Sequence, residues 1–513
     1  MGSSFSVCES LQLHDGNMAA ASQHGQCITP PCRQDVVRSY ADLQRWCEHY
    51  FATMCSTFGS SALDCCMESA LECSISTCCS GIGAPEIAVT TICSALSHFL
   101  GREVVIPSLF AFELRQECRR ELQMLQPAPQ HIYRDILEIV RPNVKSELDS
   151  FAERMSLDQL LEIFSCPNVA LESCYCTVCQ KLCKCDKATL HIAGTACPAF
   201  SSMKGKPVGQ RCSEYFVLLA WIAQRALLQE EAIVHENVPN FMVALLQQTL
   251  GKYYVISSIV MDSAEFGIPN DRRRRITFLR HKRTLVANTC TLGDFVAMCR
   301  RGCEATWEMF LIASQAELEE ELAWARNRPS SRSHSQENTS GMHFVDALTQ
   351  SEKNSLENYM ERWPGNAVAN LNQNPERHPQ CNKGRPNLHT LFKNTGMLFS
   401  FKHMRWLTPT EILSVLMFPV RGGYFGETSS FSRSRESCGM PARSRSVMIE
   451  QAGNSMSVPV VAIPILWWLL VRRPEFLKPD TCLATSLSEA LGKAATCTLR
   501  RLNKRKLITQ DTV

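Results

Sequence analysis

The chain has 513 residues, and its 53 basic and 50 acidic side chains leave a formal net charge of +3. This near-balance neither requires nor excludes a nucleic-acid partner, while 45% hydrophobic and 20% charged residues exclude a collagen, a coiled-coil rod and a wholly disordered chain. The 27 cysteines are unusual. Because we find no secretory signal pattern, we expect them to be reduced thiols in the cytosol or nucleus, without a membrane partner.

Residues 1–70 are predicted to form a partly helical N-terminal extension, because apolar side chains recur at helical spacing over residues 36–57. From residue 71 to about residue 280, short apolar runs alternate with longer helical stretches. This pattern is typical of an α/β fold with a mostly parallel, doubly wound sheet. The predicted strands are Ser74–Cys79, Val104–Phe112, Thr189–Ala193, Ala232–His235, Tyr253–Asp262 and Arg275–Leu279.

The alternation fades over residues 281–400, which we expect to form a separate, smaller region. It resumes over residues 401–475, where the apolar run Val458–Val471 is shorter than the roughly 20 residues that span a bilayer. Residues 476–513 form a basic tail, and its cluster Arg500–Lys506 is compatible with nuclear import.

Polar features follow the first predicted strands. Between a strand and a helix, Cys79–Ala84 contains Gly81 and Gly83, and glycines there let the backbone turn sharply and approach a ligand. Glu113 and Asp135 follow the next two strands, where acids suit the ribose hydroxyls and the adenine amino group of a nucleoside. Taken singly, the loop would be a plain turn and each acid a helix cap.

Two later strand ends carry groups that could react. Cys197 lies in a loop after the strand that ends at Ala193, and a partly exposed thiol there can be a nucleophile if its thiolate is stabilised. An inert buried thiol is the alternative. Glu236 follows the strand Ala232–His235, and a carboxyl at such a strand end can act as an acid or base.

Taken in order, these segments resemble the motifs of the C5-cytosine methyltransferase family. The matching segments are Cys79–Ala84, Glu113, Asp135, Cys197, Glu236–Val238, Phe266–Arg275, Arg405–Pro419 and Gln451–Ser455. The resemblance implies a Rossmann-like methyltransferase that uses S-adenosyl-L-methionine (AdoMet), with a smaller target-recognition domain. Residues 71–280 would be the catalytic domain, residues 281–400 the target-recognition region, and residues 401–475 a return to the catalytic domain.

The resemblance also implies roles for single residues in a DNA (cytosine-5)-methyltransferase. The Cys197 thiolate would add to C6 of a cytosine flipped out of the duplex, Glu236 would hold and protonate N3, and Arg272 or Arg274 would position the base. The implied AdoMet-binding residues are Cys79, Gly81, Gly83, Glu113, Asp135 and Asn454.

Two alternatives to a DNA methyltransferase stay open. Phe266–Asn270 resembles the tRNA-modifying branch of the family, so RNA is the second candidate substrate. The family's Pro before the nucleophile is Ala196 and its Gln after it is Pro198, which favours a catalytically inactive nucleic-acid-binding homologue as the third hypothesis.

A cysteine-rich insertion lies at about residues 138–188, between the third motif and the nucleophile. Zinc-binding cysteines usually form two separated Cys-x2-Cys pairs and only one such pair is present, so a surface loop is the preferred interpretation and a zinc site the minority one. The cysteines concerned are Cys174, Cys176, Cys179, Cys183 and Cys185.

Overall fold

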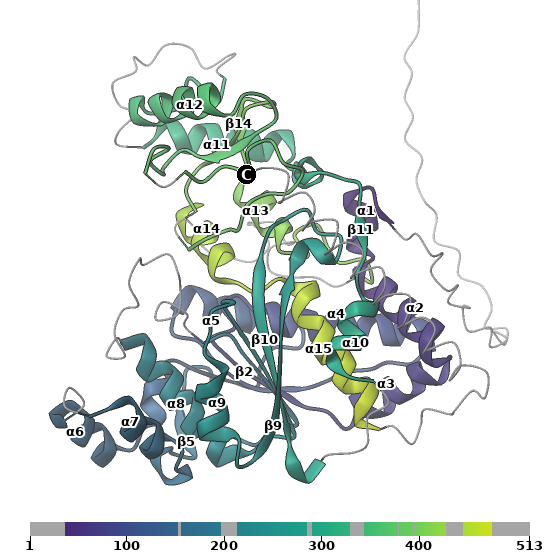
Figure 1. The fold of residues 1–513 in the computed structure, drawn as a ribbon, viewed down its shortest axis with the longest axis vertical. Coiled ribbons are helices and arrows are strands. Elements are labelled where there is room, and N and C mark those ends of the chain that lie inside the picture. Colours follow the sequence, from purple (N-terminus) through teal and green to yellow (C-terminus); the bar gives the residue numbers. More distant parts are fainter. Residues whose placement is uncertain are drawn as a thin grey trace, which may run out of the picture.

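A nine-stranded sheet forms the centre of the computed structural model (Figure 1). The residues that the structure describes are 36–151, 155–195, 213–284, 290–328, 343–377, 379–393, 395–426 and 445–473. Cys197 and the basic tail lie outside them. Across the sheet the strands are β6 (Lys181–Lys184), β5 (Ser173–Cys176), β4 (His131–Tyr133), β3 (Ser108–Phe112), β2 (Ile75–Cys78), β7 (Leu190–Ala193), β8 (Ala232–Asn237), β10 (Arg273–His281) and β9 (Tyr254–Asp262).

The sheet is parallel in its middle and antiparallel at both edges. Strands β4, β3, β2, β7 and β8 are parallel neighbours, whereas β10 runs antiparallel to both β8 and β9, and the hairpin β5–β6 is antiparallel to β4. This arrangement confirms the predicted α/β fold with a mostly parallel sheet. The hairpin β5–β6 was not predicted, and it lies within the cysteine-rich insertion.

Helices cover both faces of the sheet, because alternate side chains of each strand point to opposite faces. In β8, Ala232 and Val234 belong to one apolar cluster and Ile233 to the other. The first cluster includes α4 (Ala84–Leu100) and α10 (Leu292–Met298). The second includes α7 (Leu157–Phe164), α8 (Ser213–Leu228) and α9 (Val243–Leu250). The parallel strands are therefore buried on both sides.

The predicted helix over residues 36–57 is two helices, α1 (Tyr40–Gln44) and α2 (Trp46–Phe58), followed by α3 (Ser61–Leu71). The first helix begins only at Tyr40 because the Ser39 side chain accepts a hydrogen bond from the Asp42 backbone N–H, which caps the helix. Residues 36–37 form β1 instead and pair with β11 (Gly302–Cys303).

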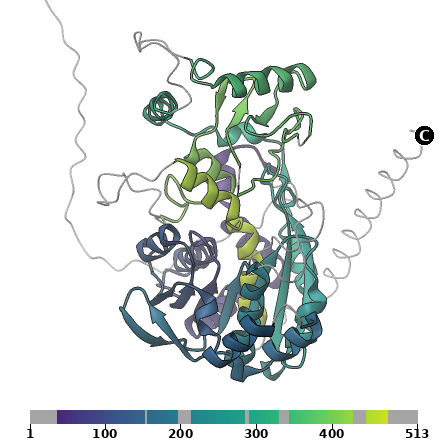
Figure 2. The ribbon, with the colours of Figure 1, turned by 90° about the vertical axis from the view of Figure 1, so that its left-hand side faces the viewer.

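A second, smaller unit has its own apolar cluster, and it lies beyond α13 and α14 in the views of Figures 1 and 2. Trp406, Tyr359 and Phe399 are buried in this cluster. The elements of the unit are α11 (Gln315–Arg326), α12 (Gln350–Arg362), β12 (Val368–Asn370), β13 (Leu398–Ser400) and β14 (Arg405–Trp406).

An ion pair braces the chain where it leaves this unit and enters α13 (Pro409–Val415). Both guanidinium amino groups of Arg405 donate to the buried Glu411 carboxylate, at 2.8 and 2.7 Å. The same carboxylate accepts from the Thr408 backbone N–H at 2.9 Å, so the acid also caps the helix. The segment that resembles the family's Arg-x-Leu-Thr-x-x-Glu motif is thus an architectural brace.

The stretch Arg445–Arg472, which comprises α14 (Arg445–Asn454) and α15 (Val458–Arg472), is long and apolar enough to cross a membrane. Within this stretch, however, 94% of the most apolar window is buried inside the protein. Helix α15 packs against α3 and α4 in the large apolar cluster. This is the position of a core helix.

Candidate functional site

The candidate site lies where the order of the sheet reverses. From β2 the chain moves outward through β3 to β4, and then returns to pair β7 against the other side of β2. In an open sheet of this kind, ligands bind outside the carboxyl ends of the strands at such a switch point. The loops that follow β2 and β7 carry the predicted glycine motif and the predicted nucleophile.

The glycine loop after β2 makes a sharp turn into α4. Cys79, Gly81 and Gly83 all have positive φ angles, of 54°, 61° and 89°. The positive φ at Gly83 favours glycine, and a Cβ atom there would also displace the Leu125 side chain, whose methyl carbon would lie 2.7 Å away.

Glu86, in the first turn of α4, forms hydrogen bonds with residues in and next to this loop. It was not among the predicted residues. Its carboxylate accepts from the hydroxyls of Thr77 at 2.5 Å and Ser80 at 3.2 Å. Burial raises the pKa of Glu86 above its ordinary value, although both hydroxyls oppose the shift. A glutamate in a first helical turn is usually a solvated residue, so the sequence carried no signal that would have distinguished this one.

Glu113 reaches the glycine loop from the end of β3. Its two carboxylate oxygens accept from the backbone N–H groups of Gly81, at 3.0 Å, and Arg115, at 3.1 Å. Only 8% of the residue is exposed, and burial raises the pKa of Glu113 to about 7 against the opposing effect of these N–H groups. The structure therefore brings together two of the predicted AdoMet-binding segments.

Asp135 and Cys79 lie in the same region. The Cys78 thiol and burial raise the pKa of Cys79, and the nearby charges of Glu113 and Asp135 raise it further. One Asp135 oxygen accepts from the Leu137 backbone N–H at 3.0 Å, so this acid also caps a short 3-10 helix. The ligand role and the capping role that the sequence offered are therefore compatible.

The segment that leads to Cys197 is anchored to β8. The Thr195 hydroxyl lies 2.7 Å from His235 Nε2, and the Asn237 side-chain amide donates to the Thr195 carbonyl at 3.1 Å. Burial lowers the pKa of His235 to about 3, so the ring is neutral near pH 7. Ala196, Cys197 and Pro198 lie outside the described residues, and the geometry of the site stops at Thr195.

Glu236, which lies between the two anchors His235 and Asn237, forms an ion pair with Arg274 of β10. The distance from Arg274 Nε to Glu236 Oε1 is 3.0 Å, and the two side chains are only 17% and 12% exposed. A Cβ atom on Gly194 would lie 3.7 Å from Glu236 Oε2 and 3.5 Å from the Cys79 carbonyl oxygen. The acid therefore lies at the junction of the two loops.

Arg272, which was predicted as an alternative to Arg274, occupies a different place. It is buried, and its guanidinium donates to the carbonyls of Leu391, at 3.1 Å, and Ser455. Arg272 thus ties the loop between β12 and β13 to the turn after α14. Only Arg274 reaches Glu236.

The turn after α14 lies next to the glycine loop. A Cβ atom on Gly81 would lie 3.5 Å from the Ser455 hydroxyl oxygen, which donates to the Gln451 carbonyl at 2.7 Å. Asn454, the predicted AdoMet-binding residue, is exposed at the end of α14. Segments from residues 79 to 455 therefore converge at one edge of the sheet.

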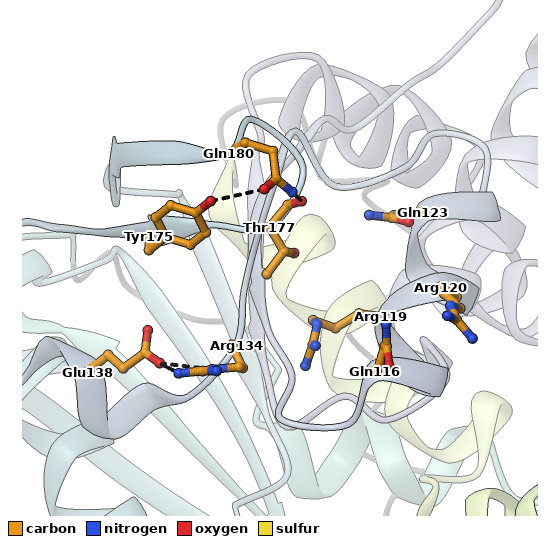
Figure 3. Close-up of a pocket in the computed structure, with 9 residues that line it drawn as sticks. All are labelled: Gln116, Arg119, Arg120, Gln123, Arg134, Glu138, Tyr175, Thr177 and Gln180. Atoms are coloured by element: carbon orange, nitrogen blue, oxygen red, sulfur yellow. Dashed lines mark hydrogen bonds and ion pairs between the residues drawn. The ribbon is translucent and has the colours of Figure 1, made fainter.

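A cavity of about 470 Å³ lies beyond β4, at the outer side of this edge (Figure 3). Arg119 and Arg120 come from α5 (Gln116–Met124), and Arg134, which follows β4, pairs with Glu138 at 2.5 Å. Tyr175 and neighbouring residues of the β5–β6 hairpin form the opposite wall. Three arginine side chains line the cavity, which was not predicted.

Comparisons with known proteins find similar solved structures, but no family model and no curated protein matches the chain. The S. pombe Dnmt2 methyltransferase has a TM-score of 0.43 and 12% identity, over 77% of this chain and 98% of that one. A putative DNA modification methyltransferase encoded within an E. coli prophage has a TM-score of 0.42 and 16% identity, over 79% and 99%. The Entamoeba histolytica methyltransferase EhMeth has a TM-score of 0.40 and 13% identity, over 79% and 99%. At such identities the likeness concerns the fold alone.

Proposed function

We propose that this chain is an AdoMet-dependent DNA methyltransferase that methylates C5 of cytosine through a covalent adduct with Cys197. The observation that carries the proposal is the Glu236–Arg274 ion pair at the sheet's switch point, beside Gly194 and the glycine loop. A partly buried carboxylate paired with arginine can bind the polar edge of a nucleobase. The sequence motifs supply the nucleophile, whose loop starts at Thr195.

The residues around the glycine loop fit AdoMet. Gly81 allows the backbone to approach the nucleoside, and Gly83 provides the sharp turn into α4. Glu113 offers buried acceptor oxygens to ribose hydroxyls, and Asp135 offers a carboxylate oxygen to the adenine amino group. Cys79 and Asn454 flank the same region. When bound there, AdoMet supplies an electrophilic methyl group on its sulfonium.

The protein's own groups then carry the covalent steps. The Cys197 thiolate adds to C6 of cytosine, and the electrons of the C5–C6 double bond move toward N3. Glu236, which takes up a proton from solvent when the base binds, gives that proton to N3. Arg274 holds the Glu236 carboxyl in place. When C5 takes the methyl group, N3 returns its proton to Glu236. The C5 proton then passes to water, the C5–C6 double bond re-forms, and the S–C6 bond breaks and returns the thiolate to Cys197.

RNA is the second candidate substrate, and the favouring feature is the segment Phe266–Asn270. Asn270 is buried, and its side-chain amide donates to the carbonyls of Leu388, at 3.4 Å, and His389, at 3.1 Å. The segment that resembles the tRNA-modifying branch therefore contacts the loop that joins β12 to β13.

The test offers methyl-labelled AdoMet with duplex DNA and with tRNA, side by side, to the purified full chain. We expect label in the cytosines of DNA. Label in tRNA alone would replace DNA with RNA as the substrate, and AdoMet binding without label in either would support the inactive homologue. The readout is the modified nucleoside, identified by mass spectrometry after digestion.

The raised pKa of Glu113 predicts that AdoMet binding depends on pH. The ionised carboxylate is the better acceptor for ribose hydroxyls, and a pKa of about 7 means that this form is lost as the pH falls through 7. The dissociation constant should therefore rise about tenfold between pH 8 and pH 6. Isothermal titration calorimetry measures this, and the Glu113→Gln variant should bind weakly with no such dependence. An equal dependence in that variant would assign the titration to another group.

A further inference from the structure

The cysteine-rich insertion folds into a β-hairpin that lies against β4 at the edge of the sheet. Its strands β5 and β6 pair Cys174 with Cys183 and Cys176 with Lys181, so Cys176 and Cys183 face the same side of the hairpin. Both of these cysteines are buried. The hairpin's own strands therefore supply two neighbouring thiols.

The turn of the hairpin adds a third thiol. The backbone N–H and the hydroxyl of Thr177 both donate to the Ile132 carbonyl of β4 at 2.8 Å, which pins the turn onto that strand. Gln180 takes a positive φ of 57°, and its N–H bonds back to the Cys176 carbonyl at 2.9 Å. This tight turn folds Cys179 back, and its backbone N–H lies 3.4 Å from Cys176 Sγ.

The fourth member of the group is a histidine from β4. His131 Nδ1 lies 3.4 Å from Cys179 Sγ. The ligand atoms of His131, Cys176, Cys179 and Cys183 all lie within 4.8 Å of one another. A tetrahedral zinc ion, with Zn–S near 2.3 Å and Zn–N near 2.0–2.1 Å, sets its ligand atoms about 3.5 to 3.8 Å apart. A small contraction of this group would therefore reach zinc geometry.

We propose that His131, Cys176, Cys179 and Cys183 bind one structural zinc ion that clips the β5–β6 hairpin to β4. Three thiolates and one imidazole are a donor set that zinc prefers, and four protein ligands leave no open position for a substrate. Cys174 and Cys185 do not belong to the group. Cys174 Sγ lies 3.7 Å from a Glu138 carboxylate oxygen, and Cys185 lies beside the Tyr133 hydroxyl.

The position of the site gives the ion a consequence beyond the hairpin. Tyr175, Thr177 and Gln180 form one wall of the cationic cavity (Figure 3). In the sequence each of them is adjacent to Cys176 or Cys179. The Tyr175 hydroxyl donates to the Gln180 side chain at 3.0 Å, which joins the strand to the turn. Zinc would therefore fix the shape of this cavity.

The test is the zinc content of the purified full chain, measured by mass spectrometry against its amino-acid content. We expect about one zinc ion per chain in the wild type. The Cys179→Ser variant should retain less than about a fifth of that content, because a serine hydroxyl is a poor zinc ligand. The matched control is Cys166→Ser, at an exposed cysteine of the same insertion, which should retain all of it.

A second measurement does not depend on any variant folding. The full chain, stripped of metal and loaded with Co²⁺, should show the visible and charge-transfer absorption of tetrahedral cobalt bound to thiolates. A wild-type chain with neither zinc nor this spectrum would overturn the proposal, as would a Cys176–Cys179 disulfide in freshly reduced protein. Unchanged zinc in Cys179→Ser would overturn it too. None of these readouts requires methyl transfer.

Discussion

The Cys197→Ala variant should transfer no methyl groups, while its affinity for AdoMet stays within about twofold of the wild type. Removal of a covalent nucleophile commonly costs several orders of magnitude in rate, and we expect a loss of at least about a thousandfold. AdoMet binding should persist because the glycine loop, Glu113 and Asp135 lie on other segments of the sheet edge. Filter-binding assays with labelled AdoMet and calorimetric titration measure the two quantities.

Glu236→Gln is the companion variant, with an expected rate loss of about a hundredfold to ten-thousandfold because the amide cannot protonate N3. Cys166→Ala serves as the matched control, since this cysteine is exposed and lies outside the site. The control should keep full activity. Methyl transfer by Cys197→Ala at a rate near that of the wild type would show that another group is the nucleophile.

The second large expected effect is a difference between two arginines of one motif, because one stabilises the fold and the other acts at the site. Arg272→Ala removes charged hydrogen bonds to the carbonyls of Leu391 and Ser455, each worth about 1.5–3 kcal/mol. The free energy of unfolding should therefore fall by about 3 kcal/mol or more. Arg274→Ala, by contrast, should lower the rate of methyl transfer and cost less stability than Arg272→Ala, because it breaks a single, partly exposed ion pair with Glu236. Chemical denaturation and single-turnover kinetics separate the two effects.

Arg273→Ala is the control for both, because Arg273 lies between them and is exposed. It should change neither stability nor rate by much. In a double-mutant cycle, Arg274→Ala should cost little once Glu236 is already glutamine, since both changes break one ion pair. A stable Arg272→Ala variant beside an unfolded Arg274→Ala variant would reverse the two assignments.

The sequence predicted four of the five parallel strands, because strands buried on both faces are continuous apolar runs, but the three-residue strand β4 is not among the predicted strands. The prediction Ala232–His235 corresponds to β8, which runs two residues further, whereas Val104–Phe112 starts four residues before β3. The antiparallel edge strand β9 begins one residue after the start of the prediction Tyr253–Asp262. The hairpin β5–β6 escaped because its strand sequences, Ser-Cys-Tyr-Cys and Lys-Leu-Cys-Lys, alternate cysteine with exposed side chains rather than forming an apolar run.

The sequence also could not predict which residues form the proposed zinc site. His131 precedes the nearest of the cysteines by many residues and is brought to them only because β4 pairs with β5, where Tyr133 opposes Cys176. The spacing of the cysteines alone could not separate Cys176, Cys179 and Cys183 from Cys174 and Cys185. The pairing register between β4 and β5 determines which cysteines lie near His131.

The sequence predicted which residues lie at the candidate site better than it predicted the role of each residue. Glu236 and Arg274 were singled out together, and the structure pairs them. Arg272 was given the same role as Arg274 because the motif alternates arginines, yet its carbonyl partners belong to loops more than a hundred residues further along the chain. No local sequence pattern predicts hydrogen bonds to residues so distant in the chain.

Trapping of the covalent adduct tests the central claim most directly. The full chain is incubated with AdoMet and a DNA duplex whose cytosines carry fluorine at C5, which cannot leave as the C5 proton does. The account predicts a denaturation-resistant complex that forms only with AdoMet, and a cross-linked peptide in which Cys197 carries the base. A preparation that methylates ordinary DNA but gives no adduct, or an adduct on a different cysteine, would contradict it.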